Sequence, residues 1–252
     1  MTDIHSHILP GLDDGSKSWD MTLEMCRLAI EDGITDIVVT PHADDTYTYN
    51  RDRVRETVAE LAGKVRDRLV FRIGCDVHLS YENIEDAIAN PQRYTIASTP
   101  YLLVEPSEFA IAPQIDDTFH RLHKAAMIPI ITHPERNAIL QRNPERVLDW
   151  VDAGCLVQVT ASSVTGFWGS NAQRTAMWLL DRYVVHVLAT DAHDDKHRTP
   201  VMSSARDAIA RRFGADVARC LVLDNPAAIV AGKPLAQPSV TQSFDSHFQR
   251  SA

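Results

Sequence analysis

Short apolar runs alternate with longer amphipathic stretches along most of this chain. The runs have the length of buried strands, and the longer stretches repeat apolar residues every three or four positions, as one face of a helix does. Strands are expected in the first residues and at 34–40, 69–77, 101–104, 128–132, 156–160 and 184–190. Helices are expected at 18–32, 50–68, 82–89, 115–126, 144–153, 171–182, 203–213 and 226–231.

Seven strands that alternate with helices, without a linker between two halves, predict an α/β fold of parallel βα units in a single domain. From Pro234 onward, Pro, Ser, Gln and Thr dominate the sequence, which is typical of a flexible tail. We therefore expect one domain over residues 1–233 and a flexible C-terminal tail over residues 234–252.

Polar residues that suit a metal ion gather at one end of the predicted strands. His5 and His7 lie two apart on the first strand, so both rings point to the same face, and the acidic pair Asp13-Asp14 follows a Pro-Gly turn. Further candidates stand at the carboxyl ends of other strands or just after them: His42, Asp76, Glu105, His133, Asp191 and His193. Imidazole and carboxylate groups brought together in this way predict a multinuclear site for divalent transition metals.

The distribution of these residues also separates two architectures. In a βα barrel the carboxyl ends of all strands form the active-site rim, whereas an open doubly wound sheet binds ligands at one switch point. Contributions from six of the seven strands favour the closed barrel. Taken singly, each residue has a plainer explanation: His42 as a turn residue, Glu105 as a solvated carboxylate, and Asp191 as a helix cap.

Two arginines in the rim loops, Arg136 and Arg198, suit an anionic substrate because a guanidinium holds a phosphate by paired N–H donors. The alternative is a salt bridge to a local acid such as Glu135 or Asp195. Of the remaining histidines, His78 and His197 are expected near the rim. The others fall inside a helix, at the amino end of a strand or in the tail: His120, His123, His186 and His247.

Composition and charge narrow the class of protein. The chain has 252 residues, of which 44% are hydrophobic and 23% charged, as in ordinary globular proteins. Its net charge of −9 and the lack of a basic run argue against non-specific binding to nucleic acid or anionic membrane. We find no signal peptide and no apolar run that approaches the ~20 residues of a membrane span. The sequence does not indicate an oligomeric state.

The four cysteines are far apart and form no C-x-x-C motif, so reduced thiols in a cytoplasm are expected. They also exclude a cysteine-dependent phosphatase, which needs an arginine six positions after the nucleophile. The residues at those positions are Asp32, Tyr81, Ala161 and Pro226. A phosphotyrosine phosphatase activity of this chain must therefore be metal-based.

Several motifs, in order along residues 1 to about 233, resemble those of the PHP (polymerase and histidinol phosphatase) superfamily. More narrowly, the chain is similar to the bacterial manganese-dependent protein-tyrosine phosphatases of capsule and exopolysaccharide operons. The motifs are Asp3-Ile-His-Ser-His-Ile-Leu-Pro-Gly-Leu-Asp-Asp-Gly15, Thr40-Pro-His42, Gly74-Cys-Asp76, Leu103-Val-Glu105, Thr132-His-Pro-Glu-Arg136, Thr190-Asp-Ala-His193, Arg198 and Asn225-Pro-Ala-Ala-Ile-Val-Ala-Gly-Lys233.

The resemblance implies a distorted (β/α)7 TIM-like barrel of the PHP type with three metal ions. Manganese is expected, with Fe, Zn, Co or Mg as substitutes. The implied metal ligands are His5, His7, Asp14, His42, Asp76, Glu105, His133, Asp191 and His193, with Asp13 as the substitute for Asp14. The implied catalytic residues are Arg136, Arg198, Asp191, His42 and His193. Two departures stand out: relatives usually have Glu where this chain has Asp76, and some have His at the position of Ala43.

The resemblance further implies metal-assisted hydrolysis of phosphotyrosine on a protein. The expected substrate is the tail of a polysaccharide-assembly tyrosine autokinase, and the expected effect is control of capsule or exopolysaccharide production. One alternative is a PHP phosphoesterase that acts on histidinol phosphate or another small phosphomonoester. An amidohydrolase would need a carbamylated lysine at a strand end, and no predicted strand ends in lysine. A metal-bound binding module without activity is the remaining alternative.

Overall fold

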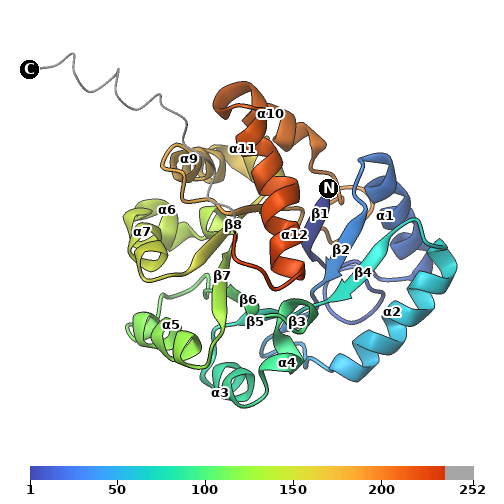
Figure 1. The fold of residues 1–252 in the computed structure, drawn as a ribbon, viewed down its shortest axis with the longest axis horizontal. Helices are drawn as coiled ribbons and strands as arrows, with labels where there is room; N and C mark the ends of the chain where they lie inside the picture. The colour runs from blue at the N-terminus through green and yellow to red at the C-terminus, as the bar shows by residue number, and fades with distance from the viewer. Residues whose placement is uncertain (236–252) are drawn as a thin grey trace, which may run out of the picture.

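The structure is a computed structural model in which residues 1–235 are described (Figure 1). All but the first two residues of the predicted tail lie outside the described residues. The seven predicted strands are present, and two of them are divided into two parts. The strands are β1 Thr2–Ser6, β2 Asp36–Val39, β3 His42–Ala43, β4 Val70–Ile73, β5 Asp76–His78, β6 Tyr101–Glu105, β7 Ile128–Thr132, β8 Leu156–Thr160 and β9 Val187–Ala189.

All strand pairs are parallel, and they form two sheets, in the orders β1-β2-β4 and β3-β5-β6-β7-β8-β9. The division falls where the chain passes Pro41, which has no N–H to donate, and Gly74. A Cβ on Gly74 would lie 3.0 Å from Cγ1 of Val38, so the close approach of β2 favours glycine there. The first parts of the two divided strands pair in one sheet and the second parts in the other.

The first strand is joined to the segment that follows the last one. Ser6 forms a parallel bridge with Ala192, and the N–H of Asp191 donates to the carbonyl of His5 at 2.8 Å. The strands therefore follow one another around an axis (Figure 1), as the predicted distorted barrel requires. The α/β class and the single domain are confirmed.

The eight predicted helices are present with ends shifted by a few residues; all but α12 surround the strands, and α12 lies across one end of them (Figure 1). They are α1 Trp19–Glu31, α2 Arg51–Val65, α3 Tyr81–Ala89, α5 Ile115–Lys124, α7 Glu145–Asp152, α9 Gly169–Leu180, α10 Ser203–Phe213 and α12 Asn225–Val230. Shorter helical turns were not predicted: α4 Pro91–Tyr94, η1 Ile96–Ser98, η2 Pro134–Arg136, α6 Ala138–Arg142, α8 Ala161–Val164, α11 Ala215–Arg219 and η3 Cys220–Asp224. The segment after β8, expected as a Ser/Thr/Gly loop, thus begins with a helical turn.

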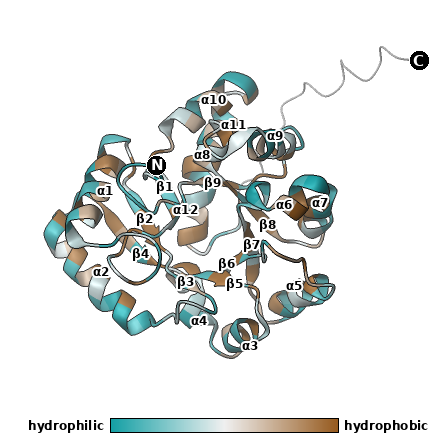
Figure 2. Cartoon of the chain, turned by 180° about the vertical axis from the view of Figure 1, so that it is seen from behind, coloured by the Kyte–Doolittle hydropathy of each residue, from teal (hydrophilic) through white to brown (hydrophobic). Residues whose placement is uncertain are grey.

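Two apolar clusters hold the barrel together, and the strands that contribute to both are largely hydrophobic (Figure 2). The inner cluster fills the space enclosed by the strands with Ile4, Val38, Leu103 and Ile130, and Ile229 of α12 packs against it. The larger outer cluster lies between the strands and the surrounding helices. At the amino end of β6, the hydroxyl of Tyr101 donates to the carbonyl of Lys233 at 2.7 Å, so the segment after α12 covers this end. The opposite, carboxyl end remains for the polar side chains.

Candidate metal centre

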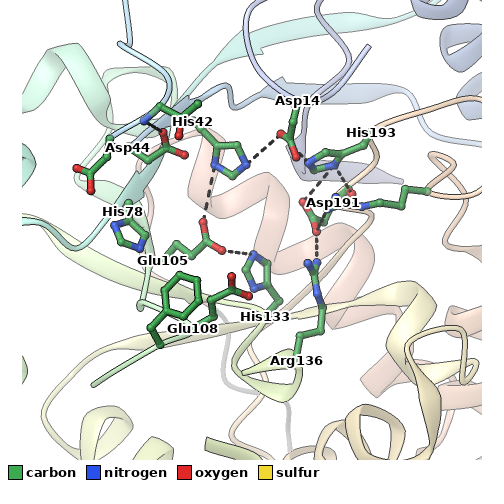
Figure 3. Close-up of a pocket in the computed structure, with 14 residues that line it drawn as sticks. Asp14, His42, Asp44, His78, Glu105, Glu108, His133, Arg136, Asp191 and His193 are labelled. Carbon is green, nitrogen blue, oxygen red and sulfur yellow. Dashed lines mark hydrogen bonds and ion pairs between the residues drawn. The ribbon is translucent and has the colours of Figure 1, made fainter. Parts of the chain in front are cut away.

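Side chains from distant parts of the chain meet at the carboxyl end of the strands (Figure 3). All nine predicted metal ligands take part. Their donor atoms form four overlapping groups, within each of which all atoms lie within 4.8 Å of one another. The groups are His7–Asp14–His42–His193, His5–His7–Asp76, His5–His133–Asp191 and His42–Asp76–Glu105. The sharing of His5, His7, His42 and Asp76 between groups suits metal ions that lie next to one another.

The two histidines of β1 are oriented by neighbours on their Nδ1 side. Nδ1 of His5 lies 3.0 Å from Oε1 of Gln158, and Nδ1 of His7 lies 2.7 Å from Oδ2 of Asp13. Both Nε2 atoms then face the centre of the cluster, 3.1 Å apart. Fixing one ring nitrogen in this way sets which nitrogen is free to bind a metal.

Gln158 was not among the predicted site residues, although its position in the sequence could have indicated a role. It is a fully buried polar side chain in the middle of β8, among apolar neighbours. Asp13 was considered only as a substitute ligand, and here its carboxylate supports His7 instead. Oδ1 of Asp14 lies 3.4 Å from Nε2 of His42 and 3.3 Å from Nε2 of His193. The first loop therefore folds back over the cluster through Asp14, as predicted.

Asp76 stands where the resemblance leads one to expect the longer side chain of Glu. Its Oδ2 lies 3.5 Å from Nε2 of His5 and 3.3 Å from Nδ1 of His42, so the shorter side chain still reaches two groups. The side chain is fully buried, and neither oxygen accepts a hydrogen bond from any described residue. A buried carboxylate without donors is costly unless a cation compensates it, so the residues present fit divalent metal ions.

Glu105 and His133 complete the cluster on the side of β6 and β7. The carboxylate of Glu105 lies 3.7 Å from Nδ1 of His42 and 3.6 Å from Nε2 of His133. His78, at the end of β5, lines the pocket above the cluster but belongs to none of the four groups. His197 does not line this pocket. His186 stands just before the amino end of β9, as predicted, and His247 lies outside the described residues.

Burial and the charges of neighbouring groups shift the pKa values of the clustered side chains strongly. Burial lowers the pKa of His5, but the carboxylates of Asp76 and Asp191 outweigh it and raise this pKa to about 9. Burial, together with the nearby charge of Asp76, raises the pKa of Glu105 to about 8. Burial also opposes the charge of Asp191, yet Arg136 and His5 hold its pKa well below the usual range. Carboxylates that crowd together in this way provide the negative charge that a divalent cation offsets.

Both predicted arginines contact one carboxylate. A guanidinium nitrogen of Arg136 donates to Oδ2 of Asp191, and Nη2 of Arg198 donates to the same oxygen at 2.6 Å. Oδ1 of Asp191 faces the other way and lies 3.4 Å from Nε2 of His5 and of His7. Asp191 therefore ties both arginines to the edge of the cluster. The expected alternatives, salt bridges to Glu135 or Asp195, are not formed.

Glu135 instead is fully buried, where it accepts hydrogen bonds from the N–H of Thr160 and the hydroxyl of Ser163. Trp168, which was not predicted, stacks on both arginines. The centre of its ring lies 4.0 Å from Cζ of Arg136 and 5.3 Å from Cζ of Arg198. Its Nε1 donates to Oγ of Ser162 at 2.9 Å, which fixes the ring. The sequence could have indicated this residue, because Trp168 is a tryptophan in a loop at the carboxyl end of the strands.

The pocket above the cluster has a volume of about 380 Å³ and opens to solvent. Besides the cluster itself, both arginines line it, so the pocket offers an anion two guanidinium groups beside the candidate metal ligands. Its outer wall carries Asp44, Asp45, Glu108 and Phe109. The arrangement is suited to hold and hydrolyse a phosphate ester.

One protein family and several named relatives match nearly the whole chain. The family described as "Capsular polysaccharide synthesis, CpsB/CapC" matches residues 1–231. The tyrosine-protein phosphatase CpsB of Streptococcus pneumoniae is 31% identical over 91% of this chain and 98% of its own length. The tyrosine-protein phosphatase YwqE of Bacillus subtilis is 29% identical over 86% and 87%. The putative tyrosine-protein phosphatase CapC of Staphylococcus aureus is 33% identical over 79% of each chain.

Solved structures show the same similarity. A structure from the work on YwqE of Bacillus subtilis and CpsB of Streptococcus pneumoniae, described as metal-dependent tyrosine phosphatases, aligns with a TM-score of 0.87 at 28% identity. The alignment covers 94% of this chain and 97% of that one. A histidinol phosphate phosphatase of Lactococcus lactis, solved with zinc, histidinol and phosphate, aligns with a TM-score of 0.56 at 13% identity and shares the fold alone.

Proposed function

Because the chain belongs to the CpsB/CapC family of capsular polysaccharide synthesis, we propose that it is a metal-dependent protein-tyrosine phosphatase. The named relatives that match it over most of its length are tyrosine-protein phosphatases. The observation that carries the proposal is the cluster of nine imidazole and carboxylate side chains with two arginines at its edge.

The proposed cofactor is manganese, with three ions held by the nine clustered side chains. The fit is supported by the fully buried carboxylate of Asp76, which has no hydrogen-bond donor among the described residues. When bound, such ions neutralise phosphoryl oxygens and make water a stronger nucleophile at neutral pH. Fe, Zn, Co and Mg remain the proposed substitutes.

The protein's own residues bind and orient the phosphate. In the proposed mechanism, Arg136 and Arg198 donate to phosphoryl oxygens of the substrate, and Trp168 holds the two guanidinium groups in place. Asp191 positions the arginines with one oxygen and serves as a metal ligand with the other. His42 and His193 are the proposed proton donors, whereas Asp191 stays ionised because two arginines donate to it. Tyrosinate leaves with a pKa of ~10, so it needs less proton donation than an alkoxide.

A phenyl ring fits the outer wall of the pocket. The side chain of Phe109 is 87% exposed, although it lines the pocket beside charged residues. An apolar ring in such a place gains from stacking against a substrate ring, which supports an aryl phosphate.

We propose a phosphotyrosine protein as the substrate, and a tyrosine autokinase of polysaccharide assembly as its physiological source. A cytoplasmic location is part of this proposal. Among residues 1–235, no helix has both the length and the apolar character of a membrane span.

The proposal is tested by rates on a phosphotyrosine peptide, p-nitrophenyl phosphate and histidinol phosphate, with and without manganese. We expect turnover of both aryl phosphates that manganese supports and EDTA abolishes. Hydrolysis of histidinol phosphate without hydrolysis of phosphotyrosine would favour the alternative, a phosphoesterase for small metabolites. Activity that survives complete removal of metal would exclude the metal-based mechanism.

A further inference from the structure

A second groove lies on the outside of the barrel between α6 and α9, which are neighbours in both views of the chain (Figures 1 and 2). Gln141 and Arg142 of α6 line one wall, and Asn171, Arg174 and Trp178 of α9 line the other. Its volume is about 550 Å³, against about 380 Å³ for the pocket over the metal cluster. The groove is therefore large enough for several side chains of a bound peptide.

The groove is basic, although the chain as a whole carries a net charge of −9. No acidic residue lines it. Arg142 forms no hydrogen bond or ion pair with any described residue, and Arg174 donates only to the neutral amide of Asn171, at 2.6 Å. Arg27 and Arg212, by contrast, are paired with carboxylates. Two unpaired guanidinium groups in one groove are thus available to an anionic ligand.

The groove starts next to the residues that are proposed to bind the phosphate. The α6 helix follows η2, which carries Arg136, and the amide of Gln141 donates to the carbonyl of Glu135 at 2.8 Å. The α9 helix begins directly after Trp168, whose ring stacks on Arg136. Arg142 and Arg174 each lie six residues further on, and along α9 the six residues from Trp168 to Arg174 correspond to a rise of about 9 Å. An extended peptide covers such a distance in about three residues.

Negative and positive side chains lie on different sides of the metal pocket, and this would determine the direction in which a bound peptide runs. Asp44 lies across the pocket from Arg136 (Figure 3), and Asp45 and Glu108 also line its outer wall. These carboxylates disfavour an acidic peptide segment on that side. The path along η2 and Trp168 leads instead to a groove with two arginines that have no carboxylate partner among residues 1–235.

We propose that the groove between α6 and α9 binds an acidic segment of the protein substrate, with carboxylates or a second phosphate about three to six residues from the reacting phosphotyrosine. Arg142 and Arg174 pair with these anions, and Trp178 offers apolar surface to the side chains between them. This inference rests on the proposed phosphatase function, since it places the reacting group in the metal pocket. It adds a preference for acidic substrates that the metal centre alone does not explain.

The test uses fluorescent peptides in which phosphotyrosine is replaced by the hydrolysis-resistant phosphonomethyl-phenylalanine. One peptide carries Glu at three to six positions from this residue on either side, and its partner carries Gln there. Binding to the full, manganese-loaded chain is measured by fluorescence anisotropy at low ionic strength. We expect the wild type to bind the acidic peptide at least about tenfold more tightly, and the Arg142→Glu/Arg174→Glu variant to lose this preference.

The matched control is Arg68→Glu/Arg211→Glu, which changes the net charge equally at two exposed arginines outside the groove. It should retain the preference for the acidic peptide. Turnover of p-nitrophenyl phosphate should stay within about twofold of wild type in both variants, because that substrate does not reach the groove. Arg142→Gln/Arg174→Gln removes the positive charge without adding negative charge and should give an intermediate loss.

Two results would overturn the inference: equal affinity of the wild type for both peptides, or equal loss of preference in the control variant. Failure of the proposed function has a different signature. In that case the wild type would fail to hydrolyse phosphotyrosine peptides and p-nitrophenyl phosphate, while the anisotropy measurement would still report whether the groove prefers acidic peptides.

Discussion

The two oxygens of Asp191 face different partners, which separates substrate binding from metal binding at the scale of single residues. Oδ1 faces the imidazoles of His5 and His7, and Oδ2 accepts from both arginines. Loss of the carboxylate therefore affects both functions, whereas loss of one guanidinium affects only one of them.

We expect Asp191→Ala to abolish turnover and to lower the bound metal, because a ligand of the cluster is removed. Arg136→Ala should keep nearly normal metal content and raise KM for phosphotyrosine peptides by about 10- to 100-fold, the value of a charged hydrogen bond to phosphate. Elemental analysis and steady-state kinetics measure the two effects. Equal loss of metal in the arginine variant would show that Arg136 is structural.

Phe109 gives a second prediction at this scale. Phe109→Ala removes the exposed ring from the pocket wall and should raise KM for aryl phosphates by about five- to tenfold, the value of one aromatic contact. The rate on an alkyl phosphate such as glycerol 2-phosphate should not change. Phe109→Tyr keeps the ring and serves as the control. A similar loss on both substrate classes would contradict a role in ring recognition.

At the scale of the element, β9 has titratable residues next to both of its ends. Its carboxyl end leads into Asp191 and His193, and His186 precedes its amino end. Nδ1 of His186 accepts a hydrogen bond from the N–H of Val157 at 3.1 Å, and only a neutral ring accepts it. Burial lowers the pKa of His186 to about 4, from 6.5 in the unfolded chain. This histidine lies far from the candidate metal ligands, so its effect on stability can be measured separately.

Because the folded state depresses this pKa, the neutral ring stabilises the fold fully above pH 6.5, and that contribution is lost as the pH falls toward 4. We expect His186 to account for ~2 kcal/mol of the lost free energy of unfolding, less than the full shift implies because the ring is partly exposed. Urea unfolding of metal-free protein between pH 4 and 7 measures it. His186→Asn keeps an acceptor without titrating and should flatten this part of the profile; an unchanged slope would contradict the assignment.

The elements that were predicted correctly are those specified by local sequence. Ser18 and Asn50 accept hydrogen bonds from the first turns of α1 and α2, so these helices begin where capping residues indicate. The division of the second strand was not predicted, because Pro41 and the close packing at Gly74 act through the neighbouring strand. The turns η2, α6 and α8 are too short to show an apolar period.

The candidate ligands were predictable because parallel strands bring their carboxyl ends together, so position along the chain translates into position in space. The same rule does not extend to the residues that orient them. Gln158 and Asp13 matter only because their side chains reach His5 and His7 across the barrel. Trp168 depends likewise on the packing of its loop against the loop of Arg136. Such contacts are set by tertiary structure, which no local pattern encodes.

At the scale of the whole molecule, the cluster links the strands around the carboxyl end of the barrel. Metal ions held there would add cross-links between elements that are otherwise joined only by hydrogen bonds and apolar packing. Binding to the folded state alone stabilises it, by about 2.7 kcal/mol for one site at a hundredfold excess of ligand over Kd.

Removal of metal with EDTA should therefore lower the melting temperature by about 5–10 °C, and manganese should restore it. Differential scanning calorimetry measures the change, and the chelator must be dialysed away before manganese is added back. Asp76→Ala should show a smaller response to EDTA than wild type, because two donor groups lose a ligand. A melting temperature that ignores both EDTA and manganese would argue against metal ions in this cluster.

The bridge between Ser6 and Ala192 affects the order in which the site can assemble while the chain is synthesised on the ribosome. His5 and Asp191 are close in space, but His5 is synthesised long before Asp191. The first strand can pair with β2 early, whereas its pairing with the segment after β9 must wait until residues 187–193 have left the exit tunnel. A nascent chain halted before that point lacks Asp191 and His193, so the two donor groups that include them are incomplete, whereas His5–His7–Asp76 and His42–Asp76–Glu105 have already been synthesised. Completion of the full metal cluster is then a late event that depends on synthesis of the last strand.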